Sequence, residues 1–181
     1  WIEFIERGGY DNPMLWLADG WAWKNENNIR CPLYWYRVGG NWLRVTLAGA
    51  VPVPPDEPVS HVSYYEADAF ACWRKARLPR ENEWEHASRR SGWDSNSGET
   101  GTQESASSKR NTLTDLERNW EWTQSAYSAY PGFRADPGMA SEYNGKFMVN
   151  QMVLRGGSVA TSPQHCRPTY RNFFHPELRW Q

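Results

Sequence analysis

Large aromatic side chains recur along the whole chain, and few of them fall into long periodic patterns. The 181 residues include 12 Trp, 9 Tyr and 6 Phe, which together make up 15% of the sequence. Another 14 Gly and 12 Pro residues divide it into short segments. Large flat rings can fix irregular segments to a core through a few extensive contacts. We therefore expect a loop-rich fold, and the pattern excludes a helical bundle or a parallel-sheet enzyme.

Length and charge restrict the classes of partner. A chain of 181 residues suits one domain with a real core, and we assign residues 1–181 to a single domain. The 20 Lys and Arg residues balance 21 Asp and Glu residues, which gives a net charge of −1. Nucleic acids and anionic membranes attract a basic excess, and no apolar run here is long enough to span a bilayer. We predict no nucleic-acid partner and no membrane partner.

Cysteine usage points to a reducing compartment. Cys31, Cys72 and Cys166 are few, odd in number and widely spaced, which does not suit a disulfide scaffold. The simplest interpretation is three ordinary packed thiols. We expect a cytoplasmic protein.

The first 60 residues contain a short helix and a hairpin. Residues 1–10 read as a helix that stops at two consecutive glycines. Residues 32–38 and 41–47 are rich in β-formers and flank another Gly-Gly pair, which predicts a two-residue hairpin turn. Residues 51–58, VPVPPDEP, are expected to form an extended connector rather than a helix or a central strand.

Two helices are predicted in the middle of the chain. Ser63 and Glu66 form an S-x-x-E capping box that opens a helix reaching about residue 75. A second helix is expected over residues 81–89, with acidic residues in its first turn. Arg80 precedes it and cannot accept the capping hydrogen bond, at a cost of about 1 kcal/mol.

The second half of the chain alternates polar loops with short β-prone runs. Residues 91–118 are rich in Ser, Gly, Thr and charge, which predicts a flexible surface loop. Residues 147–154, FMVNQMVL, are the best single strand candidate, and residues 167–174 are another.

Several blocks, in order along the chain, resemble one superfamily. They are residues 58–89 with the RLP and EWE motifs, NWEWT at 119–123 and LRGGS at 154–158. This chain resembles the formylglycine-generating-enzyme, or sulfatase-modifying-factor, superfamily. The resemblance implies an α+β, C-type-lectin-like fold with small antiparallel sheets, two main helices and extensive ordered loops.

Three further segments narrow the resemblance. Residues 15–23, 142–158 and 169–181 are similar to those of ergothioneine-biosynthesis sulfoxide synthases, also called hercynine oxygenases. These are non-haem Fe(II) oxidoreductases that use O₂ to join a cysteine-type sulfur to hercynine, Nα-trimethylhistidine. The resemblance implies a partner domain, a DinB-like helical bundle that carries the iron. We expect that domain and a final strand to lie outside this chain, and the chain alone to be a half-site without catalysis.

The residues themselves do not predict a metal site. A facial iron site needs three convergent His or carboxylate ligands. The four histidines, His61, His86, His165 and His175, show no H-x-x-x-H, H-x-D or H-x-E spacing. We predict no metal ligand within this chain, and we leave the catalytic residues unassigned.

The resemblance assigns substrate binding to the R-N-aromatic segment near the C-terminus. A trimethylammonium group is held by aromatic faces, and Asn172 offers both a donor and an acceptor. Asn172, Phe173 and Phe174 are the candidate substrate-binding residues, with Tyr143 as a fourth whose hydroxyl would lie beside the imidazole. The alternative is that both Phe rings are core residues of a strand and that Tyr143 packs a loop.

Two departures from the family pattern bear on the sulfur donor and on catalysis. One branch has an acidic residue at the position of Phe174 and uses γ-glutamylcysteine, so Phe174 favours free cysteine as donor. The same branch has two tyrosines in the loop at 138–147, one of them a catalytic acid. Here only Tyr143 matches, and Ala140 stands at the other position.

Two other functions remain open from the sequence. C-type-lectin-like domains also serve as non-catalytic ligand-binding or display modules, which the polar loop at 91–118 would suit. A sulfatase-modifying relative would bind copper through two cysteines five residues apart. Cys166 stands at the second of those places, but Thr161 occupies the first.

Overall fold

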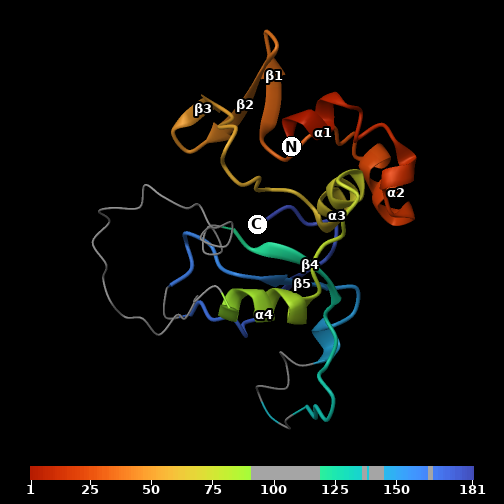
Figure 1. Cartoon of the computed structure of the whole chain (residues 1–181), viewed down its shortest axis with the longest axis vertical. Helices are drawn as coiled ribbons and strands as arrows, with labels where there is room; N and C mark the ends of the chain where they lie inside the picture. Colours follow the sequence, from red (N-terminus) through yellow and green to blue (C-terminus); the bar gives the residue numbers. More distant parts are fainter. Residues whose placement is uncertain (91–118, 136–137, 139–144, 163–164) are drawn as a thin grey trace. The chain divides into compact units, whose positions relative to one another are not determined.

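The computed structural model describes residues 1–90, 119–135, 138, 145–162 and 165–181. The chain divides into two compact units, the first formed by Trp1–Leu78 with His175–Gln181 and the second by Pro79–Phe174. Within the described residues, α-helices combine with two small antiparallel sheets (Figure 1). This confirms the predicted α+β class. The predicted loop at 91–118 lies outside the described residues.

An aromatic cluster organises the helical part of the first unit. This part comprises α1 (Ile2–Glu6), the 3₁₀ turn η1 (Pro13–Leu15), α2 (Ala18–Glu26) and α3 (Tyr64–Trp73). The buried core consists of Phe4, Tyr10, Trp16, Ile29 and Ala69. The ring of Trp1 stacks on Phe70 at 4.6 Å between centroids, and the edge of Phe4 meets both rings. Helices this short are stabilised mainly by such packing.

Glycines end the first helix, as predicted. Gly8 adopts a left-handed conformation with φ +74° immediately after α1. A Cβ atom at Gly9 would lie 2.1 Å from the Phe4 ring, so only glycine fits there. The Gly9 carbonyl accepts a 2.8 Å hydrogen bond from the Trp16 indole. The Gly-Gly pair therefore both stops the helix and lets the chain fold back over the core.

The predicted capping box is present at the start of α3 and is connected to the core. The Ser63 hydroxyl accepts from the Glu66 amide, and Oε2 of Glu66 accepts from the Ser63 amide at 2.8 Å. Oε1 of the same carboxylate accepts from the Tyr10 hydroxyl at 2.7 Å and from Arg179 at 2.9 Å. Burial raises the pKa of Glu66, and the donors from Arg179, Ser63 and Tyr10 oppose that rise. Glu66 thus joins three separate segments of the first unit.

The first unit also contains the predicted hairpin. Strands β1 (Trp35–Val38) and β2 (Asn41–Thr46) pair antiparallel across Gly39 and Gly40. Both glycines have positive φ, as a type I′ turn requires. A third strand, β3 (Gly49–Pro52), pairs with β2 at the edge of the sheet. The sequence did not predict β3, although an edge position is where a strand tolerates Pro52.

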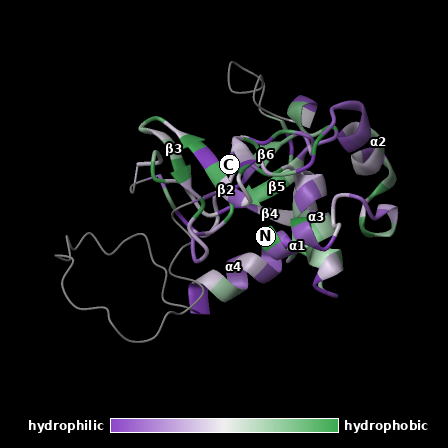
Figure 2. Ribbon diagram, turned by 90° about the horizontal axis from the view of Figure 1, so that it is seen from above, coloured by the Kyte–Doolittle hydropathy of each residue, from purple (hydrophilic) through white to green (hydrophobic). Residues whose placement is uncertain are grey.

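In the part of the second unit that the structure describes, one α-helix packs on a three-stranded sheet. The described elements are α4 (Glu81–Arg90), β4 (Glu121–Ala126), the 3₁₀ turn η3 (Gly145–Phe147), β5 (Met152–Arg155) and β6 (Asn172–Phe174). The strand order is β4-β5-β6, with β5 central and paired antiparallel to both neighbours, and the pairing with β4 is irregular between Trp122 and Ala126. Figure 2 shows α4 as mainly hydrophilic and β5 as hydrophobic. The few buried side chains of α4, Trp84 and Ser88, are four residues apart and so share one face.

The start of α4 shows how the chain replaces a missing cap. Arg80 offers no side-chain acceptor, but the Ser125 hydroxyl of β4 accepts from the Glu81 amide at 3.0 Å. Glu83 reaches back to accept from the Arg80 amide at 2.8 Å. Ser125 therefore supplies the acceptor that the sequence lacks locally, and it fixes α4 to the sheet.

Three sequence-based assignments need correction. The strand predicted over residues 147–154 is confined to Met152–Arg155, because Asn150 adopts a left-handed turn with φ +54°. The strand predicted over 167–174 shortens to Asn172–Phe174. The helix α2 was not predicted, since Leu17 at its N-cap provides no side-chain hydrogen bond.

No helix in the part of the chain that the structure describes is both long enough and apolar enough to cross a lipid bilayer.

Candidate substrate-binding site

The predicted site residues Asn172, Phe173 and Phe174 form the whole of β6, an edge strand of the second unit. Phe173 pairs with the fully buried Val153 of β5, and its two neighbours pair with Leu154 and Met152. Each of the three side chains is only partly buried. An edge strand next to a rigid central strand holds these side chains in register while leaving one side of the strand open.

Phe173 belongs to a layered stack of rings. Its ring lies parallel to that of Tyr127, with 4.2 Å between centroids and 8° between planes. The guanidinium of Arg171 lies 4.7 Å from the Tyr127 ring and 4.4 Å from the Tyr130 ring. One face of the Phe173 ring is therefore covered by Tyr127. The guanidinium of Arg171 already lies against the rings of Tyr127 and Tyr130. The sequence predicted a role for Phe173, but it gave no sign of Tyr127, on which Phe173 stacks, or of Tyr130.

The side-chain oxygen of Asn172 forms a hydrogen bond with the backbone of β6. This oxygen, Oδ1, accepts a 2.9 Å hydrogen bond from the amide of Phe173. No described residue accepts a hydrogen bond from the Nδ2 group of Asn172. Asn172 can therefore donate to a ligand oxygen but has its acceptor engaged within β6.

Phe174 points to the opposite face of the sheet from Phe173, because side chains alternate along a strand. Its ring meets that of Trp122 edge-on, with 6.3 Å between centroids. The same alternation places Asn172 on the face of Phe174. The structure thus brings Phe173 together with Tyr127, and it gives Phe174 a separate packing partner. The fourth predicted residue, Tyr143, and the neighbouring Ala140 lie outside the described residues.

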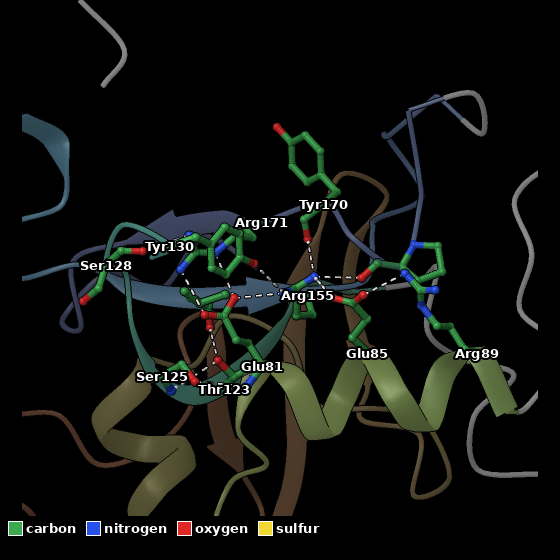
Figure 3. Close-up of polar contacts among 12 residues, drawn as sticks. Glu81, Glu85, Arg89, Thr123, Ser125, Ser128, Tyr130, Arg155, Tyr170 and Arg171 are labelled. Atoms are coloured by element: carbon green, nitrogen blue, oxygen red, sulfur yellow. Dashed lines mark hydrogen bonds and ion pairs between the residues drawn. The ribbon is translucent and has the colours of Figure 1, made fainter. Parts of the chain in front are cut away.

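A charged network lies beside this strand (Figure 3). Arg155 of β5 is 1% exposed and donates to Glu81 at 2.9 Å and to the carbonyl of Pro168 at 2.7 Å. Its guanidinium also lies 3.3 Å from Glu85, one turn further along α4. Arg171 donates twice to Glu81, at 2.8 and 2.9 Å. Two arginines and two glutamates are therefore neutralised together.

A hollow of about 490 Å³ opens over this network. It is lined by Glu81, Asn82, Glu85, Ser125, Tyr130, Arg155 and Thr169. From the sequence, the acidic first turn of α4 was expected only to complement the helix dipole, and Arg155 was noted only as part of the LRGGS motif. The spacing of Glu81 and Glu85, four residues apart on one helix face, is the signal that could have indicated a paired arginine.

The described residues do not fit an iron site. No group of three or more His, Cys, Asp or Glu side chains in the described ranges is placed to hold a metal ion. His165 lies against the Tyr170 ring at 4.4 Å, and the hydroxyl of Thr161 bonds that of Ser158 at 2.9 Å.

Cys166 is buried, Cys31 is partly buried and Cys72 is exposed. The expectation of three packed thiols is therefore wrong for Cys72.

Comparison with known proteins establishes the family. Residues 1–119 match the family described as "Sulfatase-modifying factor enzyme 1-like domain". The chain belongs to this family. The match ends before the second sheet, so it does not itself cover the candidate site.

Longer alignments cover the site as well. The chain is 34% identical to "Hercynine oxygenase" from Mycolicibacterium smegmatis and 35% identical to the protein of that name from Mycobacterium tuberculosis. Each alignment covers 99% of this chain and 47% of the relative. A "Formylglycine-generating enzyme" from Streptomyces coelicolor is 43% identical, but over 31% of this chain and 18% of that protein. The chain thus spans about half the length of the first curated relatives it matches.

Proposed function

We propose that this chain is the substrate-binding domain of a sulfoxide synthase that joins a cysteine-type sulfur to hercynine with O₂ in ergothioneine biosynthesis. The similarity to hercynine oxygenases over 99% of the chain carries the proposal. In the overall reaction one oxygen atom ends on sulfur. The other leaves as water with the hydrogens lost from the thiol and from the imidazole carbon.

The chemistry of β6 supports hercynine as a ligand. A trimethylammonium group has no N–H donor, so it binds through aromatic faces, each contact being worth up to about 2 kcal/mol when desolvated. Phe173 has one face covered by Tyr127, which holds the ring rigid for contact with a cation on its other side. The carboxylate of the same ligand is an acceptor, and the Nδ2 group of Asn172 is an uncommitted donor among the described residues.

Iron chemistry belongs to another part of the proposed enzyme. The described residues do not provide the ligands, so we propose that a DinB-like helical domain holds the Fe(II) that activates O₂. In this account the present chain binds and orients hercynine and excludes water from it. Tyr143 is proposed to place its hydroxyl by the imidazole, and the residues that act as catalytic acid remain unassigned.

The sulfur donor follows from Phe174. Its ring packs against Trp122 and presents no charge to a γ-glutamyl group, so we propose free cysteine as the sulfur donor. All three cysteines of the chain are free, which agrees with a reducing compartment, and we propose a cytoplasmic location.

Substitution of Asn172 tests the assignment. We expect Asn172→Ala to weaken hercynine binding at least about tenfold, because a lost hydrogen bond to a charged group costs about 1.5–3 kcal/mol. The measurement is calorimetric titration of hercynine into the protein. Asn82→Ala, an exposed amide on α4 that lines the neighbouring hollow, is the matched control and should bind as the wild type does. Unchanged binding by Asn172→Ala would remove Asn172 from the site, and weaker binding by Asn82→Ala would move the site to that hollow.

A further inference from the structure

Glu81 occupies a central position in the second unit although it does not belong to β6. It is the first residue of α4, and its side chain is 14% exposed. Both of its oxygens are engaged: Oε1 by Arg171, and Oε2 by Arg171 and Arg155 (Figure 3). Its amide donates to Ser125 of β4. One residue of the helix is thus fixed to β4, to β5 and to the residue that precedes β6.

We propose that Glu81 is a positioning residue that sets Asn172 and Phe173 for ligand binding by clamping Arg171. The inference rests on the proposed function. Arg171 is the residue directly before Asn172, so any shift of its side-chain anchor is passed to the start of β6. The clamp is bidentate, which fixes the direction of the planar guanidinium as well as its position.

The orientation of the Phe173 ring depends on the same clamp. A guanidinium directed by Glu81 lies within 4.7 Å of both Tyr127 and Tyr130, and its third nitrogen donates to the Ser128 carbonyl at 3.0 Å. Tyr127 in turn stacks on Phe173 at 4.2 Å. Glu81, Arg171, Tyr127 and Phe173 therefore form one continuous chain of contacts.

Charge adds a second effect. Arg155 and Arg171 carry two positive charges, and Glu81 and Glu85 balance them. Arg171 is only 11% exposed, so its charge is poorly screened by solvent. Without Glu81 an unbalanced cation would remain two residues from Phe173. The charge of Arg171 would then repel the trimethylammonium group that the Phe173 ring is proposed to bind.

Glu85 offers a matched control. It lies one turn from Glu81 on the same face of α4 and pairs with Arg155 at 3.3 Å. The ion pairs found for Glu85 join it to Arg155 and Arg89, and none joins it to Arg171. Glu81→Gln and Glu85→Gln each remove one charge from α4, but only the first releases the clamp on Arg171.

A double-mutant cycle with hercynine titrations tests the inference. We expect Arg171→Gln, which loses the clamp but leaves no unbalanced cation there, to weaken hercynine binding about tenfold, and Glu81→Gln to weaken it at least as much. The double variant should also bind about tenfold more weakly, because two residues that act through one contact do not have multiplicative effects. Glu85→Gln should change binding less than about twofold, even though it lowers the melting temperature.

Each other result is decisive. A purely structural role for Glu81 predicts that affinity follows the melting temperature in both Gln variants, and that outcome overturns the inference. So does a double variant whose binding is about a hundredfold weaker. If Glu81→Gln does not fold, Arg171→Lys keeps the charge but loses the planar fork and the stacking, and unchanged binding by that variant overturns the inference. A wild-type protein that does not bind hercynine overturns the proposed function instead, and the inference with it.

Discussion

The carboxylate of Glu66 is the single group whose loss should destabilise the first unit most. It is fully buried and acts purely as an acceptor. Oε1 accepts from Tyr10 and Arg179, and Oε2 accepts from the amide and hydroxyl of Ser63. A glutamine has a single acceptor oxygen, so in Glu66→Gln the amide nitrogen would face either the Ser63 amide or Arg179, neither of which can accept a hydrogen bond.

The expected magnitude follows from these contacts. A buried donor left without an acceptor costs about 1–3 kcal/mol, and at least one donor, the Ser63 amide or Arg179, loses its acceptor. Arg179, which is 12% exposed, would also keep a charge without its partner. Breaking one side of a buried ion pair costs about 3–5 kcal/mol. We therefore expect Glu66→Gln to lower the free energy of unfolding by about 3–5 kcal/mol.

The assay is urea unfolding at pH 8, followed by tryptophan fluorescence. Glu3→Gln is the matched control, since Glu3 forms a single exposed ion pair with Arg7. Such a pair contributes about 0–1 kcal/mol, so the control should unfold close to the wild-type midpoint. If Glu66→Gln lies within about 1 kcal/mol of the control, the description of Glu66 as the link between three segments is wrong.

Two more predictions concern the first unit. Gly9→Ala should lower the free energy of unfolding by about 2–3 kcal/mol, because the new Cβ would lie 2.1 Å from the Phe4 ring. Gly145→Ala is the control and should be near neutral, because a Cβ there meets no atom within 4 Å. Thermal melts that show the same change for both variants would refute this prediction. Burial and Asp68 raise the pKa of Tyr64 to about 12, above the value of about 10 for an unfolded tyrosine, so its stabilising contribution is complete below pH 10 and is lost as the pH rises to 12. Tyr64→Phe should flatten the loss of stability over that range in urea titrations, and an unchanged slope would contradict the assignment.

Local features of the fold could be predicted from the sequence, and the structure shows why. The capping box at Ser63, the Gly-Gly turn of the hairpin and the stop after α1 each depend on residues within a few positions of one another. The errors arose where local signals were absent or misleading. Asn150 interrupts an apolar run with a left-handed residue, and α2 begins at Ala18 after an N-cap residue, Leu17, whose side chain forms no capping hydrogen bond.

The candidate site could be predicted only in part. Asn172 and Phe173 came from a resemblance to known sequences, and their roles remain predictions. Their supports could not be read from the chain, because Glu81 and Arg171 are 90 residues apart in sequence. The replacement of the α4 cap by Ser125, 44 residues away, is likewise visible only once the sheet is formed.

The most direct measurement of the central claim compares hercynine with histidine as ligands of the wild-type protein in a calorimetric titration. The two molecules differ only in the three methyl groups on the amine. If Phe173 contacts a trimethylammonium group, hercynine should bind up to about 30-fold more tightly, the equivalent of about 2 kcal/mol. Equal affinities, or no binding of hercynine, would contradict the account.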